Sequence, residues 1–210
     1  MKNSLLLFTL LFALKITAQE VPKDSIIYLQ EVVVSKKASK SKIIKIKTRG
    51  TTVGGLGMQK LPGQVSLIKD IPPGYLNYVV FDFNSGIVNL FKKESDVVYK
   101  DTELSLVIYS VANDGSPGEK LNENQIRFVV KEDHRGTIKF DLKPLNLQSQ
   151  PQLFIGIESL STEQENSMIL KLQLNKTAVM YTKDNDGKWY LWDFGNDKIQ
   201  IKMQVGVEVD

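Results

Sequence analysis

The chain has 210 residues, of which 42% are hydrophobic and 24% charged, a composition typical of a globular protein with one sizeable domain. It contains no cysteine, which excludes disulfide bonds, thiol nucleophiles and thiolate metal sites. The formal net charge is +3, and it falls to +1 without Lys2 and Lys15, which lie at the extreme N-terminus.

Residues 1–19 (MKNSLLLFTLLFALKITAQ) have the layout of a secretory signal peptide. Lys2 supplies a positive start, Leu5–Leu14 form the apolar core, and a small residue, Ala18, lies near the end. The apolar core is too short to span a bilayer, and no later segment approaches the length of a membrane span. The sequence therefore predicts an exported protein without a transmembrane span, located in the periplasm or at the outer membrane, with secretion as the alternative.

Residues 20–63 form a predicted arm with a strong positive bias. Nine Lys or Arg and no Asp or Glu occur between Val32 and Lys69. Ser25–Ser35 is rich in Ile and Val and predicts a strand, and the alternating Lys42–Lys47 segment predicts an edge strand. Gly50–Gly63 holds five glycines and a proline, which favours a flexible linker, so we place the boundary of the arm there.

Residues 64–210 predict an all-β, jelly-roll-like sandwich. Short runs rich in β-branched and aromatic residues alternate with turns rich in Gly, Pro, Asn and Asp, and no amphipathic helix is evident. The predicted strands are Leu76–Asn84, Glu103–Ala112, Gln125–Lys131, Gly136–Leu142, Gln152–Ser159, Ser167–Leu174, Ala178–Thr182, Lys188–Asp193 and Lys198–Val209. In the last run, the apolar side chains alternate with polar ones. One face of it should be buried, and Ile201→Asp should unfold the domain.

Catalytic constellations are lacking in the sequence. The only histidine, His134, lies in a charged loop and no G-x-S-x-G segment accompanies it, which favours a solvated turn residue over a member of a catalytic triad. A single histidine also excludes multi-histidine zinc sites. The body contains twenty acidic residues, so a hydrolase with a carboxylate pair is a third hypothesis, but no pair stands out.

The segment Asp184–Lys188 partly matches a calcium-binding loop. The twelfth position counted from Asp184 is Gly195 instead of the Glu that an EF-hand needs, and the flanking residues predict strands. A hairpin turn with positive φ at Gly187 is the favoured interpretation, and calcium binding is the alternative. We assign no metal and no cofactor.

Two aromatic side chains near the C-terminus form the only candidate ligand-binding site. Tyr190 and Trp192 lie on one face of a predicted strand, and Trp189 and Leu191 lie on the other. If Trp189 and Leu191 are buried, Tyr190 and Trp192 form an exposed ledge suited to sugars or to a partner. The alternative interpretation has one tryptophan in the core and the other under a loop.

Two stretches resemble known exported proteins. Leu29–Val34 (LQEVVV) resembles a segment near the start of TonB-dependent outer-membrane receptors of the Bacteroidetes type. Residues 75–209 are similar to the C-terminal sandwich of carboxypeptidase-like regulatory domain-containing proteins. The segments that carry this similarity are Leu104–Tyr109, Asp114–Leu121, Gly136–Leu142 and Leu153–Glu158. The resemblance implies a β-sandwich and no peptidase activity, and the N-terminal regulatory-like domain of longer family members is missing here.

The sequence therefore predicts a non-enzymatic binding or accessory module of the cell envelope, with an outer-membrane or other envelope protein as a candidate partner. The alternative is a carbohydrate-binding module that uses Tyr190 and Trp192. The basic arm could bind nucleic acid or anionic lipid. However, an exported protein meets little nucleic acid and the arm lacks interleaved aromatics, so we expect no nucleic-acid partner and an arm that seeks a protein partner.

Overall fold

Antiparallel strands make up nearly all the regular structure of the described chain. The computed structural model describes residues 41–57, 62–84, 101–123, 125–160, 169–195 and 197–209. The predicted signal peptide and the predicted strand Ser25–Ser35 lie outside these residues. Within the described ranges, the only helix is the short 3-10 helix η2 (Lys143–Leu145), which is not of a length that crosses a membrane.

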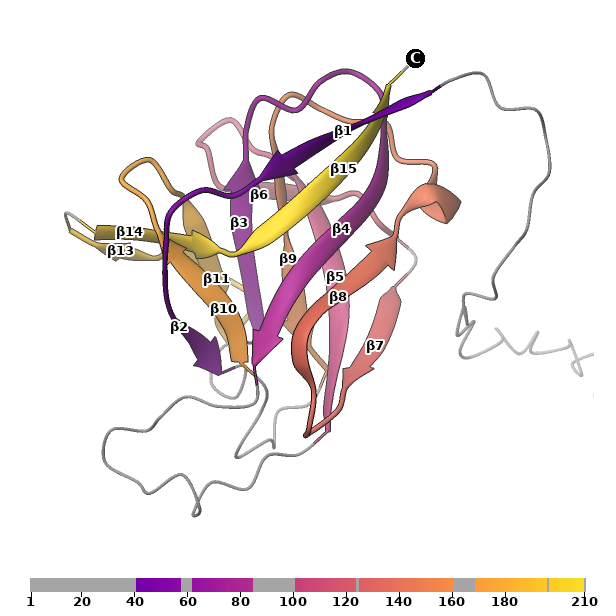
Figure 1. Ribbon diagram of the computed structural model, residues 1–210. Helices are drawn as coiled ribbons and strands as arrows, with labels where there is room; N and C mark the ends of the chain where they lie inside the picture. Colours follow the sequence, from indigo (N-terminus) through magenta and orange to yellow (C-terminus); the bar gives the residue numbers. More distant parts are fainter. Residues whose placement is uncertain are drawn as a thin grey trace, which may run out of the picture. The chain divides into compact units, whose positions relative to one another are not determined.

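The strands form two sheets, which Figure 1 shows stacked with β1, β15 and β4 in front of β3, β9 and β5. Sheet A has the order β1-β15-β4-β10-β14-β13, and in addition β2 pairs with β10 and β8 pairs with β4. Its strands are β1 (Lys42–Lys47), β2 (Thr51–Gly57), β4 (Tyr75–Asn84), β8 (Arg135–Asp141), β10 (Ile169–Leu174), β13 (Asp193–Phe194), β14 (Asp197–Ile201) and β15 (Met203–Val209).

Sheet B has the order β12-β11-β3-β9-β5-β6, and β7 also pairs with β5. Its strands are β3 (Gly63–Ile68), β5 (Thr102–Val111), β6 (Pro117–Lys120), β7 (Ile126–Val130), β9 (Leu153–Ser159), β11 (Met180–Lys183) and β12 (Trp189–Leu191). All pairs in both sheets are antiparallel. The predicted all-β sandwich is therefore confirmed.

The main core lies between the sheets and contains several phenylalanines in edge or tilted contact. Phe81 lies 6.2 Å from Phe83 and 6.0 Å from Phe140 between ring centroids. Phe128 on β7 lies 4.5 Å from Phe140 on β8, which packs the two sheets together at that end. Aromatic pairs at these separations stabilise a core beyond the area that they bury.

The alternation predicted for Lys198–Val209 is confirmed. Ile201, Val205 and Val207 are fully buried in the main core, and Ile199 and Met203 nearly so. The run is divided at Lys202 into β14, which pairs with β10, and β15, which pairs with β1 and β4. Because the break leaves the side-chain alternation intact, one apolar face continues through both strands.

The predicted flexible linker over Gly50–Gly63 is wrong for residues 51–57, which form β2 and pair with β10. The register shifts between Lys171 and Leu172, because Gly54 has no partner and bulges out with a φ of 27°. Glycine here permits a bulge within a strand, which sequence reasoning took for a linker. The edge strand predicted at Lys42–Lys47 is confirmed as β1, so sheet A includes residues on both sides of position 63.

Candidate functional site

The outer face of sheet B carries an unusual set of apolar and aromatic side chains. The strand register places three rows of residues side by side on it: Gly63, Glu158 and Ser105; Val65, Gly156 and Val107; Leu67, Phe154 and Tyr109. Val65, Val107 and Phe154 are fully buried although they point away from the main core. The outer face of a sheet is normally polar, so this second apolar cluster marks the face as special.

Aromatic rings from several strands cover this second cluster. Tyr181 on β11 contacts Phe154 edge-on at 5.4 Å between ring centroids. Trp189 on β12 contacts Tyr109 on β5 at 5.3 Å, although three strands lie between β12 and β5 in the sheet. Strands are about 4.8 Å apart, so this contact requires sheet B to curl strongly. We call these four side chains, Tyr109, Phe154, Tyr181 and Trp189, the aromatic face.

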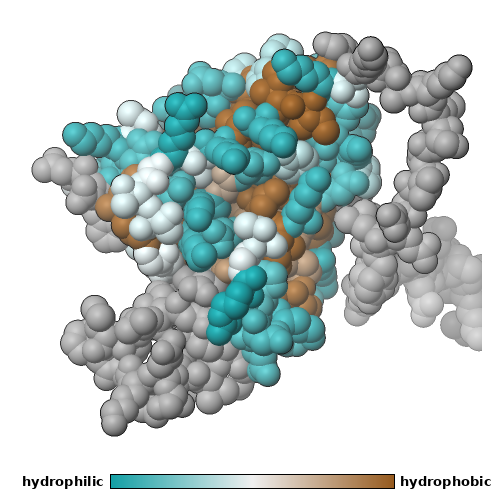
Figure 2. Space-filling model, in the orientation of Figure 1, coloured by the Kyte–Doolittle hydropathy of each residue, from teal (hydrophilic) through white to brown (hydrophobic). Residues whose placement is uncertain are grey.

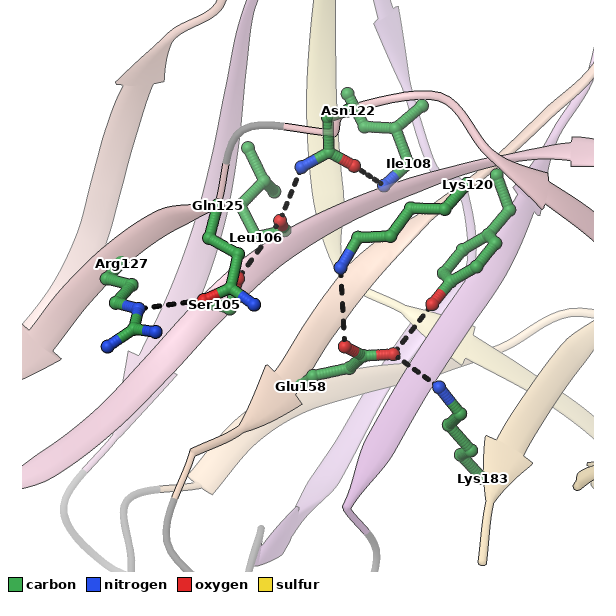
Figure 3. A network of polar contacts seen from close by, with 10 residues as sticks. Ser105, Leu106, Ile108, Lys120, Asn122, Gln125, Arg127, Glu158 and Lys183 are labelled. Atoms are coloured by element: carbon green, nitrogen blue, oxygen red, sulfur yellow. Dashed lines mark hydrogen bonds and ion pairs between the residues drawn. The ribbon is translucent and has the colours of Figure 1, made fainter. Parts of the chain in front are cut away.

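A charged network borders the aromatic face and centres on Glu158 (Figure 3). The Glu158 carboxylate accepts a 2.7 Å hydrogen bond from the Tyr109 hydroxyl and a 3.0 Å hydrogen bond from the Lys183 ammonium. The Lys120 ammonium lies 3.6 Å from its other oxygen. Only 17% of the Glu158 side chain is exposed, so these interactions are partly shielded from water.

The network favours a charged Glu158 and a neutral Tyr109. Burial tends to raise the pKa of Glu158, but hydrogen bonds from Tyr109 and Lys183 and the two lysine charges outweigh it and lower the pKa. Burial, followed by the hydrogen bond to Glu158 and its negative charge, raises the pKa of Tyr109. Tyr109 therefore stays protonated at neutral pH and donates to the carboxylate, an arrangement that fixes side chains and offers no activated base.

Lys183 also contacts the aromatic face directly. Its ammonium lies 5.3 Å from the centroid of the Trp189 ring, within the range of a cation–π interaction. One lysine thus connects the Glu158 network with the ring of Trp189. The border of the face combines cations, a carboxylate and partly exposed aromatic rings, which are the groups that orient polar ligands on an apolar surface.

Tyr190 and Trp192, the residues predicted from sequence to bind a ligand, do not form a ledge of two exposed rings. Tyr190 is 53% exposed at the edge of sheet B, whereas Trp192 is partly buried and packs against the main core. The condition for the ledge, burial of Trp189 and Leu191 in that core, is not met. Trp189 instead packs on the second cluster, and Leu191 is 49% exposed.

The predicted hairpin turn at Asp184–Lys188 is confirmed. Gly187 has a φ of 81°, the Lys188 amide donates to the Asp184 carboxylate at 2.8 Å, and the strands on either side are β11 and β12. The Asp184 carboxylate thus accepts hydrogen bonds from backbone groups and from the Tyr190 hydroxyl. Within the described ranges, no group of three or more His, Asp or Glu side chains is arranged to hold a metal ion.

His134 lies in the loop before β8 and is partly buried, not fully solvated. Its ring contacts Phe83 edge-on at 6.5 Å between centroids. No described serine or cysteine is hydrogen-bonded to it, so the described residues give His134 a packing role.

Sequence reasoning missed Glu158, Tyr109, Lys183 and Lys120 as a group. The four residues come from β9, β5, β11 and β6, and only the register of sheet B brings them together. One signal was present: within Leu153–Ser159, Phe154, Gly156 and Glu158 alternate with core residues, so a lone acid stands on the outer face. The sequence indicated either a core position or a place under a loop for Trp189, and not a position beside this network.

No protein-family model matches the chain, and no curated protein matches it. Among solved structures, the chain is similar to the crystal structure of the cysteine protease and lectin-like domains of Cwp84, a surface layer associated protein of Clostridium difficile. The identity is 14%, the TM-score is 0.50, and 85% of this chain is covered. The chain spans 38% of the length of that chain. At this identity, the likeness shows the fold alone.

Proposed function

We propose that this chain is an exported, non-enzymatic binding module of the cell envelope and that the outer face of sheet B binds its ligand. The observation that carries the proposal is that four aromatic rings and the Glu158 network lie together on the outer face of sheet B. This face points away from the main core, where polar side chains are usual. The structural neighbour supports a binding role, since that surface layer associated protein contains a lectin-like domain. The predicted signal peptide supports an envelope location.

The second candidate function is carbohydrate binding. It is favoured by Trp189 and Tyr181, whose rings are partly exposed beside the hydrogen-bonding groups of Lys183 and Glu158. Sugars stack their apolar faces on aromatic rings and place their hydroxyls against charged groups. In this version of the proposal, Trp189 and Tyr181 replace the predicted pair Tyr190 and Trp192 as the stacking residues.

A glycan array with matched variants tests the binding face. The double variant Trp189→Ala, Tyr181→Ala should lose most of the glycan signal, whereas Tyr75→Ala should keep it. Tyr75 is a suitable control because it is a 49% exposed tyrosine at the start of β4 in sheet A. A Trp192→Ala variant tests the pair predicted from sequence. Melting temperatures are measured alongside, because only variants that stay folded at the assay temperature are informative.

If no glycan binds the wild type, the carbohydrate function is wrong, and binding to isolated envelope proteins tests the wider proposal. A partner should then bind wild type and Tyr75→Ala but not the double variant. Equal binding by a folded double variant would exclude the outer face of sheet B. The resemblance to carboxypeptidase-like regulatory domain-containing proteins stays a prediction. So does the pairing of residues 26–34 with the sheet edge of a partner. Deletion of residues 20–40 tests this pairing without removing β1.

A further inference from the structure

The outer face of sheet A carries a concentration of positive charge that the proposed function does not use. Lys47, Gln204, Val80 and Lys139 are directly opposite one another in register, on β1, β15, β4 and β8. Asn84 follows Val80 by four residues on β4, and the residue opposite it on β8 is Arg135. Between these two rows, Asp82 binds Lys171 at 2.9 Å and Lys202 at 2.8 Å.

We call Lys47, Arg135, Lys139, Lys171 and Lys202 the basic patch. Among the described residues, Asp82 is the one carboxylate within it. Three other acids on this face lie outside the patch: Asp141 is opposite Tyr78, in the row of Lys45, Glu208 is opposite Tyr75, and Asp193 is opposite Lys198. The Glu208 carboxylate accepts hydrogen bonds from the Ser41 hydroxyl at 2.6 Å and from the Asn77 amide at 2.8 Å. Within the patch, the five cations thus outnumber the single carboxylate of Asp82.

The two lysines beside Asp82 serve the fold, which leaves three cations for another role. Asp82 is 8% exposed, and burial would raise its pKa, but the hydrogen bonds and charges of Lys202 and Lys171 lower it overall. By contrast, Lys47, Arg135 and Lys139 are exposed, and the carboxylates of the described residues form no ion pair with them. Exposed like charges on one face repel each other, so a binding role would account for their accumulation.

The chemistry of the patch fits a diffuse layer of anions better than a single sugar. Four of its five cations are lysines, which act as hydrated point charges without the fixed fork of arginine. The ring of Tyr78, in the row next to that of Lys139, is only 5% exposed and is covered by the Lys139 ammonium at 4.3 Å. Within the described part of this patch, no ring is thus open for a sugar to stack on. Figure 2 shows the same face as mainly hydrophilic, with hydrophobic residues in separate areas.

We propose that the basic patch docks the protein on the anionic phospholipid headgroups of a membrane surface. Lysine side chains near such a surface are each attracted to its negative potential, and the attraction falls off within a Debye length. Sheet B faces away from sheet A, so the aromatic face stays open while the patch is docked.

Vesicle sedimentation tests the proposal, with the exported protein from which residues 1–19 have been removed. Phosphatidylcholine vesicles with and without phosphatidylglycerol are the probes. The patch variant is K47Q, R135Q, K139Q, which leaves the Asp82 ion pairs intact. The control variant is K69Q, K176Q, K188Q, which removes the same charge from exposed positions outside sheet A. Both variants are checked for an unchanged melting temperature.

Wild type and control should bind the anionic vesicles and not the neutral ones. The patch variant should bind about fivefold more weakly for each cation removed, hence on the order of 100-fold in total. Raising the salt from about 0.1 M to about 1 M should abolish wild-type binding. Equal binding by patch and control variants, or equal binding of wild type to neutral vesicles, would overturn the proposal. So would binding to soluble polygalacturonate without binding to vesicles, because the ligand would then be an acidic polysaccharide.

Discussion

Lys183 and Glu158 form an ion pair across an intervening strand: their Nζ and Oε1 atoms are 3.0 Å apart, although β3 lies between β11 and β9. The residue of β3 that lies between them in register is Gly63. A Cβ atom there would lie 3.0 Å from the Lys183 Cβ and 3.3 Å from the Glu158 Cγ. A glycine at this position therefore gives the two side chains room to meet, and the Glu158 network depends on it.

Glu158→Gln should destabilise the fold in a pH-dependent manner. At pH 7, we expect a loss of about 1–3 kcal/mol, because Tyr109, Lys120 and Lys183 lose a charged partner. The folded-state pKa of Glu158 is lowered, so its carboxylate stabilises the fold above the unfolded-state pKa of about 4.3. This contribution is lost as the pH falls below that value and through the folded-state pKa.

Urea denaturation of wild type and Glu158→Gln between about pH 3 and pH 7 measures this effect. The difference in the free energy of unfolding should shrink on the acid side. A difference that stays constant down to the lowest pH would contradict a lowered pKa. Glu132→Gln is the control, since Glu132 is an exposed acid outside the network, and its change should stay within about 0.5 kcal/mol.

Tyr109→Phe should change the alkaline limb of the stability profile. The fold raises the pKa of Tyr109 through burial and through Glu158, so it favours the protonated phenol. That contribution is complete below the unfolded-state pKa of about 10 and is lost as the pH rises above it. The variant should lose about 1 kcal/mol at neutral pH and then fall less steeply than wild type above about pH 10. Tyr75→Phe is the control, since Tyr75 lies outside the network. If the stability of wild type and Tyr109→Phe fell equally steeply above about pH 10, this role of Tyr109 would be ruled out.

The fold was largely predictable because its strands carry their own pattern. Alternating β-branched and aromatic residues identified Tyr75–Asn84, Thr102–Val111 and the run that became β14 and β15 within a few residues. Sequence reasoning missed β2, β3, β6 and β13. The glycines of β2 and the Pro117–Lys120 segment of β6 have the composition of turns, and only pairing with β10 and β5 makes them strands.

The candidate site was not predictable for a different reason. Tyr109 and Glu158 are 49 residues apart in sequence, and Glu158 and Lys183 are 25 apart, so their meeting depends on the register of sheet B. The pattern at 189–192 correctly placed Trp189 and Tyr190 on opposite faces. It could not tell that the outer face of sheet B has an apolar cluster of its own, which leaves Trp189 there and turns Trp192 toward the main core.

Gly206→Ala should destabilise the protein through a clash with a single side chain. A Cβ atom at this position would lie 2.3 Å from Cε1 of Tyr78, the ring that packs across β15. The expected cost in the free energy of unfolding is about 1–3 kcal/mol, as for other overpacked sites. In a Tyr78→Val background, the same substitution should cost well under 1 kcal/mol, because the ring is gone. Equal costs in both backgrounds, measured by urea denaturation, would show that another contact excludes the side chain.

Asn122 fills a gap in the hydrogen bonding of β5, and its replacement should weaken the fold locally. Along one edge, β5 pairs with β7 over Thr102–Leu106 and with β6 at Tyr109 and Val111. In between, the Asn122 amide donates to the Leu106 carbonyl at 2.9 Å and accepts from the Ile108 amide at 2.8 Å (Figure 3). The side chain thus takes the place of a strand residue where β5 changes partners.

Asn122→Ala leaves two buried backbone groups without these partners, since Asn122 itself is only 2% exposed. We expect a loss on the order of 2–4 kcal/mol in the free energy of unfolding. Amide hydrogen exchange of Ile108 should accelerate more than that of Val107, because the bond to Asn122 is the one removed. Asn185→Ala, in the exposed turn between β11 and β12, should change stability by less than about 0.5 kcal/mol. Unchanged protection of Ile108 would mean that β6 or β7 can close the gap, and β5 would then not depend on this side chain.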